Sequence, residues 1–443
     1  MNILYLAHRI PFPPDKGDKL RAFRQIEYLS KRHQVWCACF VDTPGDHQYI
    51  ERLRQYCESV TAIPLPGSRH VATALRGLWG LMCGGTITEA VYRSDAMSGA
   101  LSNGFPSVEF DVVVAFSSSM APYALSVPAR RRVLDMCDCD SRKWLDYAEA
   151  SPGLRGVLYE LEGNRLKRQE KAWVEAFDAT ILITSAEATT LRATAPPGKL
   201  HIVGNGVILP EPWALARAKS ASERACRNNA TVGFVGVMDY RPNVDAVCWF
   251  VSECWREIRA VVPDAVFRIV GRSPVRRVRR LERVPGVEVV GRVDDVLTEL
   301  RHFDVSVAPM RIARGLQNKV LEAMAAAKPV VLTSKAAEGI DACNGRDYII
   351  ADHADRIIRV VRRLLGHPEE RERIGQAARQ FVALHHRWED MLAQFELIVT
   401  GMVGWREVRN EKLEVGKTQP EVASPHVNRS ASPLRSSHLS LLT

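Results

Sequence analysis

The sequence predicts a parallel α/β fold divided into two halves. Short apolar strands alternate with helical stretches along most of the chain, and residues 304–333 contain a strand, a helix and a second strand in succession. A polar, alanine-rich stretch with two prolines, residues 210–230, separates the halves and is typical of a linker. With 443 residues and 46% hydrophobic content, the chain has enough apolar material for two cores.

The composition indicates a soluble globular protein with a net charge of +9. The chain begins with the strand 2–7, without a basic segment followed by an apolar run, so we expect a cytoplasmic location and not export. The ten cysteines form no CxxC pair. The Cys37/Cys39 and Cys137/Cys139 pairs have the spacing of small buried side chains on strands, which favours burial over zinc binding. This use of cysteine fits a reducing compartment.

The first half opens with a strand, a loop over residues 8–19, a helix and the strand 34–41. The loop contains one glycine and three prolines, so it lacks the GxGxxG pattern of NAD-binding proteins. Gly17 permits close approach of the backbone to a phosphate, with Lys19 and Arg21 in the first turn of the helix. The alternative is a proline-stiffened surface loop with solvated charges.

The next distinctive segment, residues 69–82, has apolar residues at helical spacing. Its stripe consists of Val71, Leu75, Leu78, Trp79 and Met82. The run is too short to span a bilayer. Two alternatives remain open: the stripe covers the core of the domain, or it lies on a membrane surface near a lipid-linked acceptor.

Strands over 111–116 and 132–136 extend the first sheet, and the second of them leads into an acidic turn. There, Asp138-x-Asp140 matches the short DxD pattern of metal-dependent glycosyltransferases with a single-domain GT-A fold. The alternative is that Asp140 or Ser141 caps the following helix. A long amphipathic helix over 154–177 and a strand over 179–184 follow.

The second half repeats the alternation, with strands over 231–235, 266–270 and 287–290 and helices beginning at Asp245 and Asp294. The basic run 276–283 is either a solvated helix face or a contact with anionic lipid headgroups. Helices are also predicted over 352–365 and 369–384.

The crossover at residues 304–333 carries the main candidate site. Lys319 and Glu322 lie at i, i+3 in the first turn of its helix, beyond the carboxyl end of a strand. A cation beside a helix N-terminus suits a diphosphate, and a carboxylate can accept hydrogen bonds from two ribose hydroxyls. The alternative for the two residues alone is a surface ion pair.

Residues 315–325, Gly315-Leu-Gln-Asn-Lys-Val-Leu-Glu-Ala-Met-Ala, followed by Pro329-Val-Val, resemble the donor-site segment of family-4 retaining glycosyltransferases. That family has the GT-B fold of two facing Rossmann-like domains. The resemblance extends over residues 1–403. It includes His201-Ile-Val-Gly-Asn-Gly-Val, similar to the turn that closes the first domain, although Ile208 replaces the usual aspartate. Residues 135–144 and 159–162 resemble a bacterial subgroup linked to exopolysaccharide systems that accompany exosortase sorting.

The resemblance implies which residues form the site. Lys319 would stabilise the departing diphosphate and Glu322 would bind the ribose, and both are the expected catalytic residues. The implied donor-binding residues are Gly17, Gly236, Arg292, Arg314, Gly315, Asn318, Lys319, Leu321 and Glu322. Those on the acceptor side are Arg9, Asp15, Lys16, Asp18 and Lys19.

The chain departs from the family pattern at two places. Arg314 stands where a second glutamate usually lies near the donor sugar, and Val237 and Pro242 replace an arginine and a lysine that usually face the donor phosphates. Positive charge must then come from Lys319, Arg311 or Arg314.

The resemblance also implies a division of the chain. Residues 1–208 would be the acceptor-side domain, 209–230 the linker, 231–387 the donor domain and 388–403 a helix that returns to the first domain. Residues 404–443 are rich in serine, proline and charge, so we expect them to be disordered.

We therefore expect a glycosyltransferase that uses a UDP- or GDP-linked sugar and a glycan or lipid-linked acceptor. No cofactor, metal ion or nucleic acid is expected, and peripheral contact with the inner face of the plasma membrane remains open. The alternatives are a nucleotide-sugar epimerase or hydrolase on the same fold, and a catalytically silent nucleotide-binding scaffold.

Overall fold

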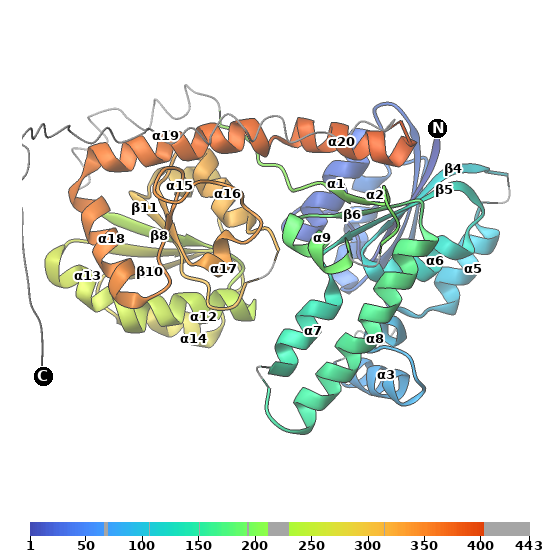
Figure 1. Cartoon of the computed structure of the whole chain (residues 1–443), viewed down its shortest axis with the longest axis horizontal. Coiled ribbons are helices and arrows are strands. Elements are labelled where there is room, and N and C mark those ends of the chain that lie inside the picture. Colours follow the sequence, from blue (N-terminus) through green and yellow to red (C-terminus); the bar gives the residue numbers. More distant parts are fainter. Residues whose placement is uncertain are drawn as a thin grey trace, which may run out of the picture. The chain divides into compact units, whose positions relative to one another are not determined.

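The computed structural model describes residues 1–65, 70–105, 107–149, 151–192, 195–210, 230–313 and 315–402. These residues form two parallel sheets, each covered by its own helices (Figure 1). We call the first sheet with its helices the N-terminal lobe, and the second the C-terminal lobe. The predicted α/β architecture of two Rossmann-like sheets is confirmed. The tail 404–443, expected to be disordered, lies outside the described residues.

The sheet of the N-terminal lobe has the order β3-β2-β1-β4-β5-β6-β7, and all its neighbouring strands are parallel. Its strands are β1 (Asn2–Ala7), β2 (Gln34–Val41), β3 (Ser59–Pro64), β4 (Phe110–Phe116), β5 (Ala129–Cys137), β6 (Ala179–Leu182) and β7 (Leu200–Ile202). The near-continuous apolar runs of the central strands fit a sheet that is buried on both faces.

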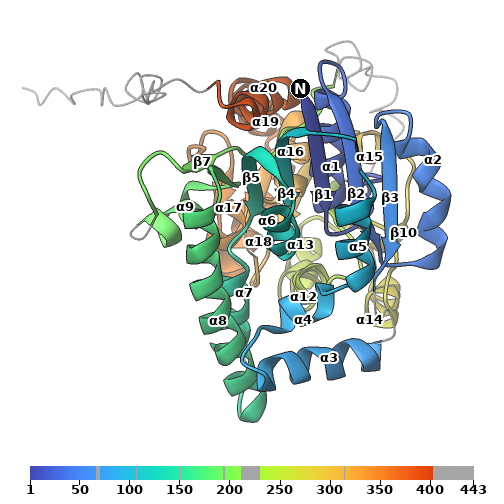
Figure 2. The ribbon, with the colours of Figure 1, turned by 90° about the vertical axis from the view of Figure 1, so that its right-hand side faces the viewer.

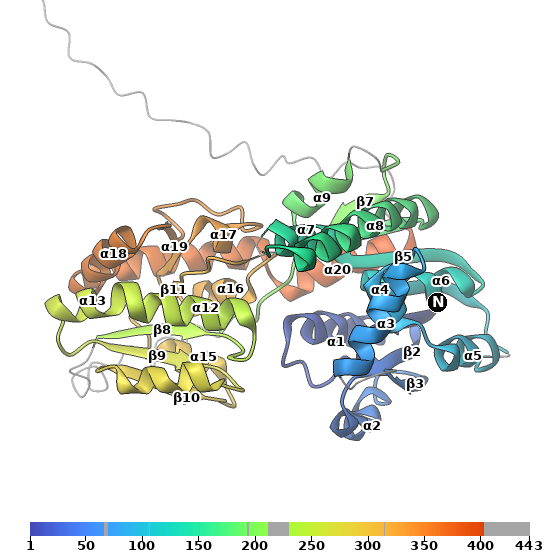
Figure 3. The same ribbon diagram turned by 90° about the horizontal axis from the view of Figure 1, so that it is seen from below.

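The helices of this lobe make two cores, one on each face of the sheet. They are α1 (Gly17–Leu29), η1 (Pro44–Tyr49), α2 (Ile50–Leu53), α3 (His70–Met82), α4 (Ile87–Tyr92), α5 (Asp95–Asn103), η2 (Ser118–Met120), α6 (Ala121–Ser126), α7 (Asp140–Glu149), α8 (Leu154–Ala176) and α9 (Ser185–Arg192). Phe23 and Ile26 of α1 lie in one core, and Leu166 and Trp173 of α8 lie in the other. Helices α7 and α8 pack as a pair (Figure 3), with Gly163 fitting closely against Leu145.

Helix α3 presents its predicted apolar stripe to solvent. Leu75, Leu78, Trp79 and Met82 are between 43% and 73% exposed, so the expectation that they cover the core is wrong. The opposite side of α3 packs on α4 through glycines: a Cβ at Gly80 would lie 2.4 Å from that of Ala90. Small residues permit this close approach of the two helices, and the large side chains of the stripe remain exposed to solvent. The side chain of Val71 lies outside the described residues.

The sheet of the C-terminal lobe has the order β10-β9-β8-β11-β12-β13 and is also parallel. Its strands are β8 (Thr231–Val235), β9 (Val266–Val270), β10 (Val287–Gly291), β11 (Val305–Ala308), β12 (Val330–Leu332) and β13 (Ile349–Ile350). Strand order reverses between β8 and β11, which is the doubly wound arrangement that places ligands beyond the carboxyl ends of these two strands.

Helices cover both faces of the second sheet (Figure 1). They are α12 (Arg241–Phe250), the π-helical turn η3 (Val251–Trp255), α13 (Arg256–Val261), α14 (Arg276–Arg279), η4 (Arg280–Arg283), α15 (Val296–Arg301), α16 (Asn318–Ala325), α17 (Ser334–Ala337), α18 (Ala354–Gly366) and α19 (Pro368–His385). Helix α12 begins before the predicted Asp245, because Pro242 is favourable in a first helical turn. The arginines of the basic run 276–283 are exposed.

The last described helix, α20 (Trp388–Thr400), packs on the N-terminal lobe as predicted. Its Phe395, Ile398 and Val399 join the core that contains Ile3 and Tyr5. A Cβ at Gly206 would overlap the backbone of Trp388, so the turn after β7 and the start of α20 are in direct contact. Within the described residues, no helix combines the length and apolar character needed to cross a bilayer.

We predict that Phe395→Ala lowers the free energy of unfolding by about 3–5 kcal/mol, because Phe395 is fully buried and truncation leaves a cavity. Urea unfolding followed by circular dichroism measures this difference. The control Leu397→Ala, on the same helix but 46% exposed, should change it by less than about 0.5 kcal/mol. Equal effects of the two substitutions would contradict the packing of α20 described above.

Candidate functional site

The candidate site lies where strand order reverses in the second sheet. The turn after β8 begins at Gly236, and the loop after β11 leads into α16. Asn243 joins the two segments, because its Nδ2 donates to Val237 O (2.9 Å) and its Oδ1 accepts from Lys319 Nζ (2.5 Å). Asn243 therefore connects the turn that begins at Gly236 to the first turn of α16, which carries the predicted residues Lys319 and Glu322.

Lys319 is a partly buried cation in the first turn of α16. Its ammonium lies 5.1 Å from the centroid of the Phe234 ring, and its hydrogen-bond partner Asn243 is uncharged. Burial lowers the pKa of Lys319 to about 8, and the nearby Glu322 carboxylate offsets part of this effect. No carboxylate of the described residues forms an ion pair with this ammonium. A bound diphosphate would supply the missing negative charge.

Glu322 lies one turn further along α16. Burial raises its pKa to about 7, and Lys319 opposes the shift. Among the described residues, no hydrogen bond or ion pair of the Glu322 carboxylate is found, so the surface ion pair considered for Lys319 and Glu322 is absent there and only the longer-range effect of Lys319 on Glu322 remains. A carboxylate without protein partners is available to accept hydrogen bonds from ligand hydroxyls.

The other predicted donor residues differ in where they lie. Gly315, with φ of +62°, lies in the loop three residues before α16, and Asn318 is the first residue of that helix. Arg292 is exposed, and its guanidinium has no partner among the described residues. The side chain of Leu321 is buried in the core of the C-terminal lobe. Arg314 lies outside the described residues.

Of the other expected sources of positive charge, Arg311 is already paired. Its guanidinium contacts Asp245 (Nη2 to Oδ1, 2.5 Å) and lies over the Trp249 ring. Among the described residues, Lys319 is therefore the cation beside the N-terminus of α16 that has no ion-pair partner.

The loop 8–19 of the N-terminal lobe approaches this site. A Cβ at Gly17 would lie 3.1 Å from Asn318 Nδ2, and Asp15 forms an ion pair with Arg272 (2.6 Å). The Asp18 carboxylate forms ion pairs with His8 and Arg9. Burial alone would raise the pKa of this carboxyl, but the two partners hold it well below its usual range. Lys16 is exposed.

The expectation that Lys19 and Arg21 face a phosphate is wrong. Lys19 is buried and pairs with Asp46 (3.2 Å), and the buried Arg21 pairs with Asp135 of β5 (2.8 Å). The two side chains leave different sides of α1, because they are two residues apart on a helix, and each is held by a carboxylate of the N-terminal lobe.

A buried polar network, not predicted from the sequence, connects the N-terminal lobe to the site. Asp135 accepts from Arg21 and from Gln25 Nε2 (2.6 Å). Arg21 Nη1 donates to Asn205 Oδ1 (3.0 Å), and Asn205 Nδ2 donates to Asn318 Oδ1 (3.0 Å). The network therefore reaches the first residue of α16. An arginine in the interior face of an amphipathic helix is the signal that identifies such a network in the sequence.

The acidic turn after β5 lies near the same segment. Neither Asp138 nor Asp140 caps the N-terminus of α7. Glu187 accepts a hydrogen bond from Cys139 N, and Glu170 accepts one from Ser141 N (both 2.9 Å). The predicted capping is thus performed by other carboxylates. Within the described residues, no group of three ligating side chains is arranged to hold a metal ion.

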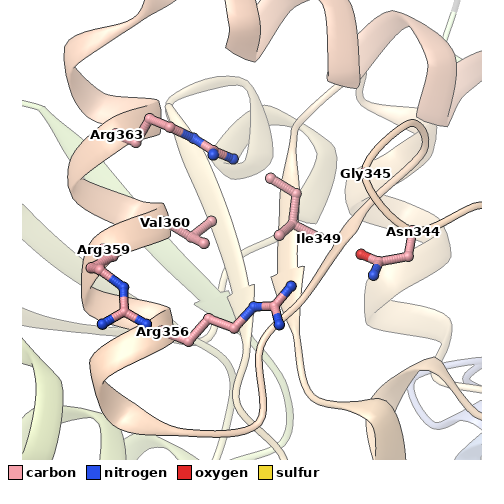
Figure 4. Close-up of a pocket in the computed structure, with 7 residues that line it drawn as sticks. All are labelled: Asn344, Gly345, Ile349, Arg356, Arg359, Val360 and Arg363. Carbon is pink, nitrogen blue, oxygen red and sulfur yellow. The ribbon is translucent and has the colours of Figure 1, made fainter. Parts of the chain in front are cut away.

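A separate hollow of about 560 Å³ lies beside β13 (Figure 4). It is lined by Asn344, Ile349 and three arginines of α18, of which Arg363 pairs with Glu370. Asn344 precedes β13, so part of the hollow lies toward the amino end of the strand, whereas ligands of such sheets bind beyond the carboxyl ends. We interpret its exposed arginines as a solvated helix face.

Comparison with known proteins identifies the class of the second lobe. Residues 229–367 match the family model described as glycosyl transferases group 1. No curated protein sequence matches the chain.

Three solved structures illustrate the fold. HepE of Anabaena in complex with UDP is 13% identical, with a TM-score of 0.62, and the match covers 90% of this chain and 100% of that one. The sucrose-phosphate synthase of Thermosynechococcus elongatus is 14% identical, with a TM-score of 0.65 and coverage of 91% and 99%. WaaG, a glycosyltransferase involved in lipopolysaccharide biosynthesis, is 15% identical, with a TM-score of 0.61 and coverage of 90% and 100%.

The two-lobed structure is therefore the GT-B fold, and the single-domain GT-A alternative is wrong. The match of residues 229–367 to the group 1 model agrees with the predicted enzyme class, a glycosyltransferase.

We predict that Glu322→Gln weakens binding of UDP or GDP by about 1.5–3 kcal/mol, because a charged acceptor of ribose hydrogen bonds becomes neutral. Isothermal titration calorimetry measures the affinity. The exposed Glu369→Gln should bind as the wild type does. Unchanged affinity of Glu322→Gln would remove this residue from the site.

Proposed function

We propose that the protein transfers a sugar from a nucleoside-diphosphate sugar to a glycan or lipid-linked acceptor. The observation that supports this most is the placement of Lys319 and Glu322 where strand order reverses, with neither side chain in an ion pair among the described residues. Helix N–H groups and an ammonium suit a diphosphate, and a carboxylate one turn away suits a ribose.

The chemical work at this site would be electrostatic. As the bond between the sugar and the diphosphate breaks, negative charge grows on the leaving phosphate. Lys319 and the positive end of the α16 dipole stabilise that charge from fixed positions, which lowers the barrier. The resemblance to family-4 enzymes supports retention of the anomeric configuration, and the resemblance of residues 135–144 supports a role in exopolysaccharide biosynthesis.

The acceptor would enter from the N-terminal lobe. A hollow of about 260 Å³ lies between α4 and α6 and is lined in part by Tyr92, Ser118, Ser119, Tyr123 and Trp173. Serine hydroxyls and aromatic rings are suitable contacts for a sugar or an isoprenoid-like acceptor.

The apolar stripe of α3 supports peripheral contact with the cytoplasmic face of a membrane. Helix α8 lies beside α3 (Figure 2), and Arg165 joins them by donating to Leu81 O (2.6 Å). The first two turns of α8 expose a second apolar set, consisting of Leu154, Val157, Leu158 and Leu161. Lys167, Arg168 and Lys171 of the same helix are exposed, so basic groups accompany the apolar surface, as suits an anionic bilayer.

We predict that transfer survives excess EDTA, because the chain itself supplies the charge that a metal ion provides in the GT-A class. Lys319→Ala should lower turnover by roughly 10²–10³-fold, the typical effect of removing one fixed stabilising group. The exposed Lys335→Ala is the matched control and should keep wild-type turnover.

The assay is a panel of nucleotide sugars scored for both hydrolysis and transfer to a lipid extract. Loss of transfer in EDTA with recovery in manganese, and wild-type turnover of Lys319→Ala, would contradict the electrostatic role. Sugar release that ignores added acceptor would favour an epimerase or hydrolase, and nucleotide binding without turnover would favour a silent scaffold.

We predict that the protein sediments with vesicles containing phosphatidylglycerol and less with vesicles of phosphatidylcholine alone. The double substitution Leu78→Ser/Trp79→Ser should weaken binding about tenfold or more, because two apolar side chains no longer enter the interface. Leu384→Ser/Leu397→Ser, at exposed apolar positions of α19 and α20, is the control. Equal binding of both variants, or self-association through α3 without vesicle binding, would contradict the membrane contact.

A further inference from the structure

The hollow of about 260 Å³ between α4 and α6 has a base of hydroxyl groups and aromatic rings. Ser118, Ser119, Tyr123 and Trp173 line it and are all buried. The Ser118 hydroxyl donates to Asp140 (2.5 Å) in the turn after β5. Hydroxyl groups beside aromatic rings are suitable contacts for a sugar.

The turn after β5 connects the base of this hollow to the candidate donor site. Asp140, which accepts from Ser118, is two residues beyond Asp138, and a Cβ at Gly315 would lie 2.6 Å from Asp138 Oδ1. Gly315 belongs to the loop that leads into α16, the helix that carries Lys319. A sugar in the hollow would therefore have its inner end toward the donor.

The mouth of the hollow carries an arginine that is joined to α3. Arg93 is exposed and lines the hollow, and its carbonyl oxygen accepts from Arg76 Nη2 (2.7 Å). Arg76 lies on α3, three residues before Trp79 of the exposed apolar stripe, so it borders that stripe. Burial raises the pKa of Tyr123, and both guanidinium groups oppose the shift, which places both of them near the hollow.

These two arginines have no carboxylate partner in the part of the chain that the structure describes. Two carboxylates do line the hollow: Glu89 accepts from Gln169 Nε2 (2.9 Å), and Asp95 lies in the first turn of α5. Carboxylates suit the hydroxyls of a sugar, whereas guanidinium groups bind phosphate through paired N–H donors. Both arginines are therefore available to a phosphate group.

Three kinds of surface thus follow one another on this side of the lobe. The apolar stripe of α3 comes first, the two arginines border it, and the polar, aromatic hollow follows. Helix α3 packs on α4, which forms one wall of the hollow (Figure 2). A lipid chain, a phosphate and a sugar joined in that order present the same succession of chemistry. Cations at the edge of an apolar helix face suit the phosphate level of a bilayer.

We propose that the acceptor is a sugar carried on a membrane lipid through a phosphate or diphosphate, and that Arg76 and Arg93 bind this phosphate. The lipid chain stays in the bilayer that the α3 stripe contacts, and the sugar occupies the hollow. The two arginines determine specificity, because they distinguish this acceptor from a soluble glycan. This assignment rests on the proposed glycosyltransferase function.

Binding of a phosphate-bearing lipid tests the arginine site without requiring transfer. The probes are farnesyl diphosphate and farnesol, which has the same chain without phosphate. Calorimetry on the full chain measures both affinities in excess UDP and GDP, which keep the diphosphate of the probe out of the donor site. The wild type should bind farnesyl diphosphate about tenfold or more tightly than farnesol, because hydrogen bonds to a charged group are among the strong ones.

Substitution of the arginines should remove this preference. Arg93→Ala and Arg76→Ala should each lose about tenfold or more in affinity for farnesyl diphosphate and keep the affinity for farnesol. The matched control Arg130→Ala removes an arginine that is 77% exposed near the start of β5, and it should bind both probes as the wild type does.

Transfer to a lipid extract provides the second measurement. Arg93→Ala should raise KM for the lipid-linked acceptor about tenfold or more, while kcat and the affinity for the nucleotide sugar stay within about twofold. Release of the glycan from its phosphate by mild acid should abolish the difference between Arg93→Ala and the wild type, because the group that Arg93 binds is then gone.

Equal affinity of the wild type for the two probes, or wild-type affinity of Arg93→Ala for farnesyl diphosphate, would overturn the phosphate site. Weaker binding of Arg93→Ala to phosphatidylglycerol vesicles, with unchanged affinity for farnesyl diphosphate, would instead assign this arginine to bulk lipid headgroups. Equal KM for the acid-released glycan and the lipid-linked acceptor would overturn the acceptor class and leave the proposed function standing. A wild-type chain that binds no nucleotide sugar would contradict the proposed function itself, whatever its affinity for the lipid probes.

Discussion

The buried ion pair between Arg21 and Asp135 is the constraint on which the arrangement of the site depends. Arg21 is 2% exposed and Asp135 is fully buried, so each charge is stable there only because the other is present. Removing one partner of such a pair costs about 3–5 kcal/mol, because an uncompensated charge remains. The same arginine donates a hydrogen bond to Asn205, and Asn205 donates one to Asn318 at the start of α16. The core of the N-terminal lobe is thereby connected to the first residue of the helix that carries Lys319.

This arrangement leaves the positive charge of the site concentrated on Lys319. Most basic residues around it are neutralised by nearby carboxylates, as Lys19 is by Asp46 and Arg311 is by Asp245. Lys319 instead donates to an amide and lies near an aromatic ring, and burial lowers its pKa although the nearby Glu322 carboxylate opposes the shift. An anionic ligand would therefore gain more from this ammonium than from the paired cations.

Strand and helix positions could be predicted from the sequence, because periodicity and breaker residues act locally: β8 and β9 agree with prediction to the residue. The region of the site could also be predicted, since a strand followed by a helix N-terminus defines it. The partners of individual charges could not. Arg21 and Asp135 are 114 residues apart, and their contact depends on how the sheet brings β5 beneath α1. The exposure of the α3 stripe depends likewise on Gly80 packing against a later helix.

The central claim is that a nucleotide binds at the N-terminus of α16, where the first N–H groups of the helix lack partners within it. Hydrogen–deuterium exchange with and without UDP or GDP tests this claim directly. We expect slower exchange on nucleotide addition for residues 315–322 and for the turn 236–243. Slower exchange confined to the arginine hollow beside β13, or no change anywhere, would contradict it.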